Sequence, residues 1–386
     1  MKRVFAYAMS VVALAACREI SGPDARSASA TNVTSEGTNA VSTKTTGVKT
    51  VDLGTLTGWP SAANAVNAAR VIVGSGYTGA NYSGQLHAVR WRETTSGSGV
   101  WTISDVSAFV TGSTRSAASG VNALGDLVGT MQNSAGANLS FTLTADNIFT
   151  EIDPPAGLNS IAAYGMNATG GVVGSTTLTP DPMGTTTRAF YYQSGAIAVL
   201  PSLSGSSGAT AINDNGTIAG YSYDALGARR AVQWSYIGGA WTITTLPAST
   251  NSANESYIAG AVNSTGEFAG SGCPTVTTSG CTGPRPYLWT TATSTPILFG
   301  SLGGTSGAAT GINDAGDIAG WSYTSSGYQR AFFAKSGSNV LTELNPLVSG
   351  GGYSYGAGVS GHLVVGQSSY PAARMNTVHA TLWIVP

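Results

Sequence analysis

The stretch GINDAGDIAG, from Gly311 to Gly320, decides the fold, because variants of it occur seven times along the chain. Each copy combines a run of small residues, an apolar residue and usually Asn, a turn, an apolar triplet and a fixed glycine. Spacings of 45 to 55 residues between these glycines, with strand-like character throughout, are typical of propeller blades or solenoid coils. The fixed glycines are Gly74, Gly129, Gly174, Gly220, Gly270, Gly320 and Gly366.

Each copy contains four strand-like pieces separated by turn signals. In the sixth copy they are Ala308–Ile312, Asp317–Tyr323, Arg330–Ala334 and Asn339–Leu344. Four short antiparallel strands make one blade of a β-propeller. The first piece is rich in Ala and Gly, which suits an innermost strand where blades crowd the axis. The Asn that follows it is expected to begin a tight turn.

The ends of the chain complete one another. The last copy supplies only three pieces, and Val48–Leu56 matches the missing fourth. Pairing this N-terminal strand with the last copy would close a ring and remove exposed strand edges. We therefore predict an all-β fold: a seven-bladed β-propeller of four-stranded antiparallel blades, closed by the N-terminal strand. A β-solenoid or β-sandwich array is the alternative.

The first residues form a targeting segment. Lys2 and Arg3 precede an apolar stretch, Val4–Ala16, that is too short to span a bilayer. It ends in Leu-Ala-Ala-Cys17, which resembles the lipobox of bacterial lipoproteins. We predict a signal peptide over residues 1–16, a lipidated Cys17 with a disordered tether over 17–46, and the propeller over 47–386. An ordinary signal peptide with a chance Cys is the alternative.

The third piece of each copy resembles a known family. Its tripeptides, followed in several copies by Trp and preceded by the Asn turn, are similar to the bacterial extracellular HAF repeat, and the resemblance covers nearly all of residues 61–386. Two copies depart from the pattern: the second has Leu139-Ser140-Phe141 and the seventh has Ser360 instead of Asn. The resemblance implies an extracellular or surface location and no established activity, whereas the lipobox resemblance, with Arg18 after the Cys, favours the outer membrane. The tripeptides include His87-Ala88-Val89, Arg188-Ala189-Phe190, Arg330-Ala331-Phe332 and His379-Ala380-Thr381.

Composition limits the partners. Only 9% of the 386 residues are charged and the net charge is −1, so no basic surface for nucleic acid is expected. We expect a monomer that contacts the membrane only through its lipid anchor. Cys273 and Cys281 are expected to form a disulfide in an exported protein. Two thiols with no nearby His make a poor metal site, so we expect neither metal nor cofactor.

Candidate catalytic residues belong mostly to the repeat. His87 and His379 occupy its tripeptide position, where a structural hydrogen bond to a backbone carbonyl or an Asn is expected. Acidic residues follow the Asn and are interpreted as turn residues, while Glu255 and Asp153 lie outside the repeat rule. We therefore predict no catalytic residues and no enzyme. A polysaccharide-acting propeller enzyme and a passive envelope protein are the alternatives.

One face is the best candidate for binding. The loops between second and third strands are the longest and the richest in Tyr, set among Ser, Gly, Thr and Asn. Such surfaces combine rigid contact area with adaptable hydrogen bonding, which suits a glycan or protein ligand. The alternative is that these aromatic residues pack down on the blades. The candidate ligand face comprises Tyr77, Tyr82, Tyr221, Tyr223, Trp321, Tyr323, Tyr328 and Tyr370.

Overall fold

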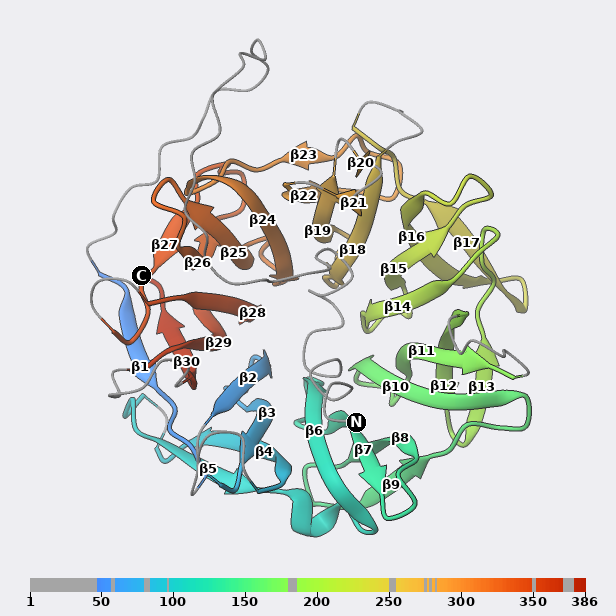
Figure 1. Cartoon of the computed structure of the whole chain (residues 1–386), viewed down its shortest axis with the longest axis horizontal. Coiled ribbons are helices and arrows are strands. Elements are labelled where there is room, and N and C mark those ends of the chain that lie inside the picture. Colours follow the sequence, from blue (N-terminus) through green and yellow to red (C-terminus); the bar gives the residue numbers. More distant parts are fainter. Residues whose placement is uncertain are drawn as a thin grey trace.

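The described part of the chain forms a closed ring of β-sheets. The computed structural model describes residues 47–386 except 57–59, 80–83, 96, 180–185, 250–254, 274–275, 278–279, 282, 349–351 and 371–377. The predicted signal peptide, Cys17, the tether and Tyr82 lie outside these residues. The described residues form seven four-stranded antiparallel sheets around one axis, which confirms the seven-bladed β-propeller (Figure 1). Blades are numbered here in chain order.

The blades follow the repeat. Blade 1 consists of β2 (Ser61–Val66), β3 (Ile72–Tyr77), β4 (Leu86–Glu93) and β5 (Trp101–Asp105). Blade 2 consists of β6 (Ser113–Val121), β7 (Leu127–Asn133), β8 (Asn138–Leu143) and β9 (Phe149–Ile152). Blade 3 consists of β10 (Leu158–Met166), β11 (Val172–Leu178), β12 (Thr187–Gln193) and β13 (Ala196–Val199). Blade 4 consists of β14 (Ser207–Ile212), β15 (Ile218–Tyr223), β16 (Arg229–Ile237) and β17 (Ala240–Thr245). Blade 5 consists of β18 (Ser256–Val262), β19 (Phe268–Cys273), β22 (Arg285–Trp289) and β23 (Ile297–Leu298). Blade 6 is β24 (Gly303–Ile312), β25 (Ile318–Thr324), β26 (Gln329–Ala334) and β27 (Thr342–Leu344).

The seventh blade joins the two ends of the chain. It consists of β28 (Ser354–Ser360), β29 (Leu363–Ser369), β30 (Val378–Ile384) and β1 (Lys49–Asp52), and β1 is its outermost strand. Lys49 pairs with Ile384 and Asp52 with Thr381. This confirms the predicted closure by the N-terminal strand. Two small elements were not predicted: a 3-10 turn at Ser107–Phe109, and the hairpin of β20 (Val276–Thr277) and β21 (Gly280–Cys281).

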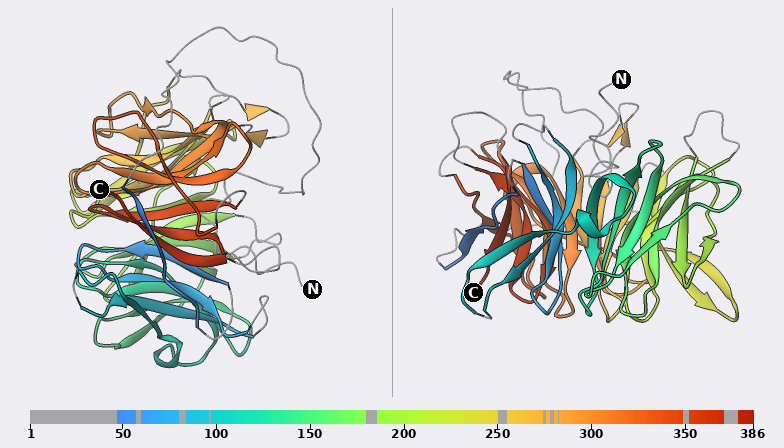
Figure 2. Two further views of the ribbon diagram at one scale, coloured as in Figure 1. Left: turned by 90° about the vertical axis from the view of Figure 1, so that its left-hand side faces the viewer. Right: turned by 90° about the horizontal axis from the view of Figure 1, so that it is seen from below.

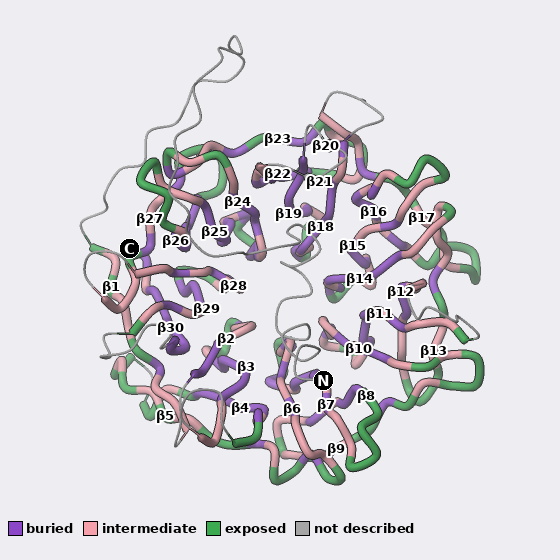
Figure 3. The backbone as a smooth tube through the Cα atoms, in the orientation of Figure 1, coloured by how far each residue is buried: buried purple, intermediate pink, exposed green. Residues whose placement is uncertain are grey.

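The ring has two faces, which carry different loops (Figure 2). The long-loop face carries the loops between second and third strands and the links between blades. The Asn-turn face carries the turns between first and second strands and the hairpin turns between third and fourth strands. Buried residues gather in the first three strands of the blades, while the outer turns are exposed (Figure 3).

Close packing explains the fixed glycines. Gly320 in β25 lies against the neighbouring first strand, so a Cβ there would overlap the Ala308 carbonyl oxygen and press on the Phe332 ring. The other fixed glycines meet a first-strand carbonyl in the same way, which leaves no room for a side chain. A β-bulge recurs beside this contact, as in the register shift between Ala309 and Gly311 of blade 6.

The repeated Asn residues form a hydrogen-bonded belt around the Asn-turn face. Each Asn is buried, and its Oδ1 accepts the backbone N–H four residues on, as in Asn213 and Thr217 (2.9 Å). Each Nδ2 donates to the next blade, so the Asn binds its own turn and its neighbour. The six donations are Asn67 to Asn122 O (2.8 Å), Asn122 to Asn167 O (3.2 Å), Asn167 to Asn213 O (3.2 Å), Asn213 to Asn263 O (2.8 Å), Asn263 to Asn313 O (3.1 Å) and Asn313 to Gly361 O (2.9 Å).

The seventh turn has a different length. Val66 pairs with Ile72 across the first Asn turn, whereas Val359 pairs with Val364, so the turn at Ser360 is one residue shorter. The belt therefore consists of one Asn in each of blades 1 to 6 and ends at the Gly361 carbonyl of blade 7. The contact between blades 7 and 1 depends on other bonds, among them Ala380 N–H to Ser61 Oγ (2.9 Å).

We expect Asn213→Ala to lower the free energy of unfolding by about 1–3 kcal/mol, because it leaves the part-buried Thr217 N–H without its partner and removes the bond between blades to the Asn263 carbonyl, which keeps only its bond from Gly266 N–H. Urea unfolding followed by tryptophan fluorescence measures this loss. Asn215→Ala is the matched control, since Asn215 also donates to the next blade, at Ser264 O (2.8 Å), but from an exposed position. An equal loss in both variants would contradict the structural role of the belt.

Candidate functional site

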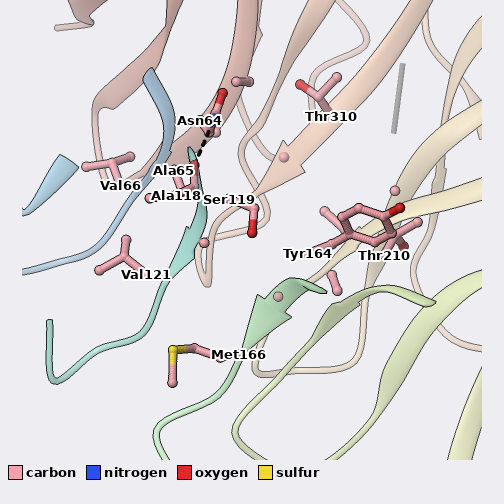
Figure 4. A pocket seen from close by; sticks show the side chains of 18 of the residues that line it. Asn64, Ala65, Val66, Ala118, Ser119, Val121, Tyr164, Met166, Thr210 and Thr310 are labelled. Carbon is pink, nitrogen blue, oxygen red and sulfur yellow. Dashed lines mark hydrogen bonds between the residues drawn. The ribbon is translucent and has the colours of Figure 1, made fainter. Parts of the chain in front are cut away.

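The ring axis contains a cavity of about 330 Å³ formed by the first strands (Figure 4). Small residues such as Ala65, Gly165 and Gly311 line its wall, as predicted for an innermost strand. An apolar collar surrounds its end next to the Asn turns. The collar consists of Val66, Val121, Met166, Ile212, Ile312 and Val359.

Four polar side chains of this wall donate hydrogen bonds to the next blade. They occur at the bulged residue of the first strand in blades 1, 2, 4 and 6, and each reaches the first strand of the following blade. These donated hydrogen bonds stabilise the ring. The donations are Asn64 to Ala118 O (2.7 Å), Ser119 to Ala163 O (2.7 Å), Thr210 to Ala259 O (2.6 Å) and Thr310 to Gly356 O (2.8 Å).

Two tyrosines in the wall were missed by the sequence analysis. Tyr164 replaces the small bulge residue of blade 3, and its hydroxyl lies 3.0 Å from Ser175 Oγ. Burial raises its pKa to about 12, with a further contribution from Tyr221, so the hydroxyl stays protonated. Burial likewise raises the pKa of Tyr355. The motif AAYGMN around Tyr164, where other copies have a small residue, was the available signal.

The described lining of the cavity is uncharged. None of the residues that line the cavity is Asp, Glu, Lys, Arg, His or Cys. The arrangement can offer apolar contact and neutral hydrogen bonds. Elsewhere, no cluster of three His, Cys, Asp or Glu that could hold a metal ion occurs among the described residues.

The histidine partners differ from the prediction. His87 and His379 bind carboxylates of the fourth strand, not backbone carbonyls or Asn: His87 Nδ1 lies 2.7 Å from Asp105 Oδ2, and His379 Nδ1 lies 3.0 Å from Asp52. Arg330 pairs with Glu343 (3.1 Å) at the same position of blade 6. In these three blades the tripeptide residue ties the third strand to the fourth, whereas Arg230 pairs with Asp224 of the preceding loop (2.8 Å). The partner was not foreseen because the acidic residue lies on another strand.

The contact of His87 with Ser107 is not a catalytic triad. Ser107 Oγ lies 2.9 Å from Nδ1, the same ring nitrogen that faces Asp105, whereas a triad needs Ser and Asp at opposite nitrogens. Burial acts to raise the pKa of the Asp105 carboxyl, but hydrogen bonds from Ser107 and His87 outweigh it and lower that pKa.

Several other acidic residues hold turns or lie away from the axial cavity. Asp214 and Asp314 accept backbone N–H groups of the preceding blade, from Ala168 (2.7 Å) and Ser264 (2.9 Å), as turn residues should. Burial and the neighbouring Asp153 raise the pKa of Glu151 on an outer strand. The buried Glu255 lies within 3.4 Å of Ser249 Oγ, away from the axial cavity.

The predicted ligand face separates into two groups. Trp321 is buried, and Tyr77, Tyr221, Tyr223 and Tyr323 are half-buried between the blades, with Tyr221–Tyr223 and Trp321–Tyr323 in edge-to-face contact. This group packs down on the blades.

The second group stays exposed on the long-loop face. Tyr328 is 44% exposed and Tyr370 is 37% exposed. The Arg330 guanidinium lies 5.1 Å from the Tyr328 ring centre, and His379 stacks on Tyr370 at 3.8 Å and 8°. Each ring is supported on one side, which limits its freedom and leaves area for contact.

The cysteine loop lies on the same face. Cys273 is disulfide-bonded, at the end of β19. The side chain of Cys281 lies outside the described part of the structure, so its predicted pairing stays a prediction. The backbone of β20 and β21 forms a short hairpin around that loop.

Comparison with known proteins supports the fold only. No family model matches the chain, and no curated protein matches its sequence. The propeller domain of the Trilobed protease from Pyrococcus furiosus is similar at 9% identity and a TM-score of 0.50, covering 84% of this chain and 93% of that one. The acylaminoacyl peptidase of Pyrococcus horikoshii gives the same identity and TM-score, covering 84% and 51%.

Lectins also resemble the chain, more distantly. The six-bladed propeller lectin of Aleuria aurantia is 12% identical with a TM-score of 0.41, covering 74% of this chain and 93% of that one. At these identities the likeness concerns the propeller fold. None of the helical segments in the described residues has the length and apolar character needed to cross a membrane.

We expect Asp105→Asn to lower stability at pH 7 by less than about 1 kcal/mol, since the Asp105 side chain is 37% exposed. Because the pKa of Asp105 is depressed in the fold, its contribution is present above the ordinary Asp pKa of about 3.9 and is lost as the pH falls through the depressed value. The difference from the wild type should therefore shrink on acidification.

Urea unfolding at pH 7 and pH 3 measures this dependence. The control is Asp146→Asn, which alters an exposed carboxylate. A loss of stability in Asp105→Asn that is the same at both pH values would contradict the role of the charged carboxylate.

Proposed function

We propose that this chain is a non-catalytic, exported repeat protein, anchored by lipid at Cys17, that binds a glycan or a protein through the long-loop face. The observation that carries the proposal is the pair of supported, exposed rings at Tyr328 and Tyr370 on neighbouring blades. A ring that is already held loses little conformational entropy on binding. It can present its free face to a sugar ring or to an apolar side chain.

The axial cavity supports binding over catalysis. Its described lining offers no side chain that changes protonation near neutral pH, and its hydroxyl and amide groups at the bulges are engaged by neighbouring blades. General acid–base and nucleophilic catalysis need such groups free and tuned. The protein is proposed to act as a monomer, since the closed ring leaves only the short outermost strands of the blades to pair between copies.

We expect the double variant Tyr328→Ser/Tyr370→Ser to fold and to lose at least one ligand of the wild type on a glycan array or in a pull-down from envelope extract. The two rings contribute exposed contact area, so their loss should reduce binding with little effect on unfolding. Leu124→Ser is the control, because Leu124 is 65% exposed on the Asn-turn face. A double variant with the complete wild-type ligand profile would refute the proposed face.

We expect Cys17→Ser to abolish lipid attachment. In a bacterial host fed labelled palmitate, the wild type should carry label and sediment with membranes, whereas Cys17→Ser should carry none, because the thiol is the acceptor of the diacylglycerol. Ser21→Ala controls for changes in the same segment. Unlabelled wild-type protein would exclude the lipid anchor and leave the binding face untouched.

A further inference from the structure

Three aromatic side chains form a row at the outer rim of the propeller, between blades 3 and 4. The row lies beside β17, the outermost strand of blade 4 (Figure 1). Tyr191 of β12 packs against Trp241 of β17 with ring centres 4.9 Å apart, and Trp241 packs against Tyr236 of β16 at 5.3 Å. The row ends in solvent, since Tyr236 is 61% exposed. It lies on the Asn-turn side, opposite to Tyr328 and Tyr370.

The inner end of the row is fixed by the blade interface. Tyr191 and Trp241 border the core cluster that Trp234 and Leu200 form between blades 3 and 4. The Tyr191 ring covers Gly171, where a Cβ would meet it at 2.8 Å, and its hydroxyl donates to Gln193 (2.7 Å). The first two rings are therefore held in place before any ligand arrives.

The outer end is fixed by a tight hairpin. Tyr236 pairs with Trp241 and Ile237 with Ala240, so Gly238 and Gly239 alone form the turn. Both glycines have positive φ, 61° and 86°, the conformation of the hairpin turn that suits twisted strands. The exposed Tyr236 thus projects from a regular strand pair and not from a long loop.

The segments that supply the rings carry no charge. Residues 189–213 and 231–254 contain no Asp, Glu, Lys, Arg or His, and the charged residues of the same strands, such as Arg188 and Arg230, lie at the opposite, long-loop ends of β12 and β16. The polar side chain bonded to the row is the neutral Gln193 amide, which accepts from the Tyr191 hydroxyl, whereas the paired Ser235 and Thr242 lie on the other face of the β16–β17 hairpin. An aromatic surface edged by neutral hydrogen-bonding groups matches a ligand with apolar C–H faces and neutral hydroxyls.

We propose that this rim row, Tyr191, Trp241 and Tyr236, is a second binding site and that it takes a neutral polysaccharide chain. Successive sugar rings can place their C–H faces on successive aromatic rings. The interplanar angles of 54° and 61° mean that the three rings share no plane. The row therefore suits a twisted, soluble chain and not a flat, crystalline one.

A protein partner fits this row poorly. A stable interface covers roughly 800 Å² on each partner. Three aromatic side chains bury about 150–250 Å² each even when completely covered, and two of these rings are already partly covered. The uncharged row also lacks the charged groups that steer protein association.

Affinity electrophoresis tests the site in gels containing galactomannan, pullulan or mixed-linkage β-glucan, with alginate as the anionic comparison. We expect at least one neutral polymer to retard the wild type and Tyr236→Phe, which keeps the ring. In Tyr236→Ser the apparent Kd should rise about fivefold, as expected for the loss of one aromatic contact. Leu226→Ser, at a 78% exposed residue of the same blade on the long-loop face, should bind as the wild type does.

Several results would overturn the rim site: no retardation by any neutral polymer, stronger retardation by alginate, sedimentation with microcrystalline cellulose, or equal binding by Tyr236→Ser and the wild type. The rim site is independent of the long-loop face. If Tyr328→Ser/Tyr370→Ser loses retardation while Tyr236→Ser keeps it, the proposed function stands and the rim site falls. The reverse result supports the rim site alone.

Discussion

The hydrogen bond from each repeated Asn to the next blade is the interaction on which the ring depends. The side chain closes its own turn through Oδ1 and reaches the adjacent turn through Nδ2, as Asn213 does towards Thr217 and Asn263. One residue thereby sets both the end of a strand and the position of the neighbouring blade. Ala and Gly on the first strands allow the blades to approach closely enough for these bonds to form.

This construction engages many of the polar side chains that a ligand would need. Ser119 and Thr210 near the axis hold neighbouring blades together, and His87, His379 and Arg330 of the tripeptides hold third and fourth strands together. The proposed binding sites therefore use residues that the repeat does not prescribe. Tyr328 and Tyr236 are examples, one on each face of the ring.

Features marked by residues that recur in the sequence pattern were predictable from the sequence. The Asn turns, the fixed glycines and the closing strand at Lys49–Asp52 are of this kind. Features that depend on strand register or on a side-chain partner from another strand were not. The bulge at Thr310, the pairing of His87 with Asp105 and the contact of Tyr191 with Trp241 each depend on register or on a neighbouring strand, which no periodic pattern encodes.

The closing strand has a consequence for the order of folding. Asp52 and its partner His379 are 327 residues apart in the chain, so their contact is among the least local in the molecule. Contacts between distant residues form slowly, because a long loop must close before they are made. Six blades can form from local hairpins along the chain, but β1 can pair only when β30 is available. Ring closure is then the last step of folding, and a truncated chain would keep the edge of its unfinished blade open to other chains.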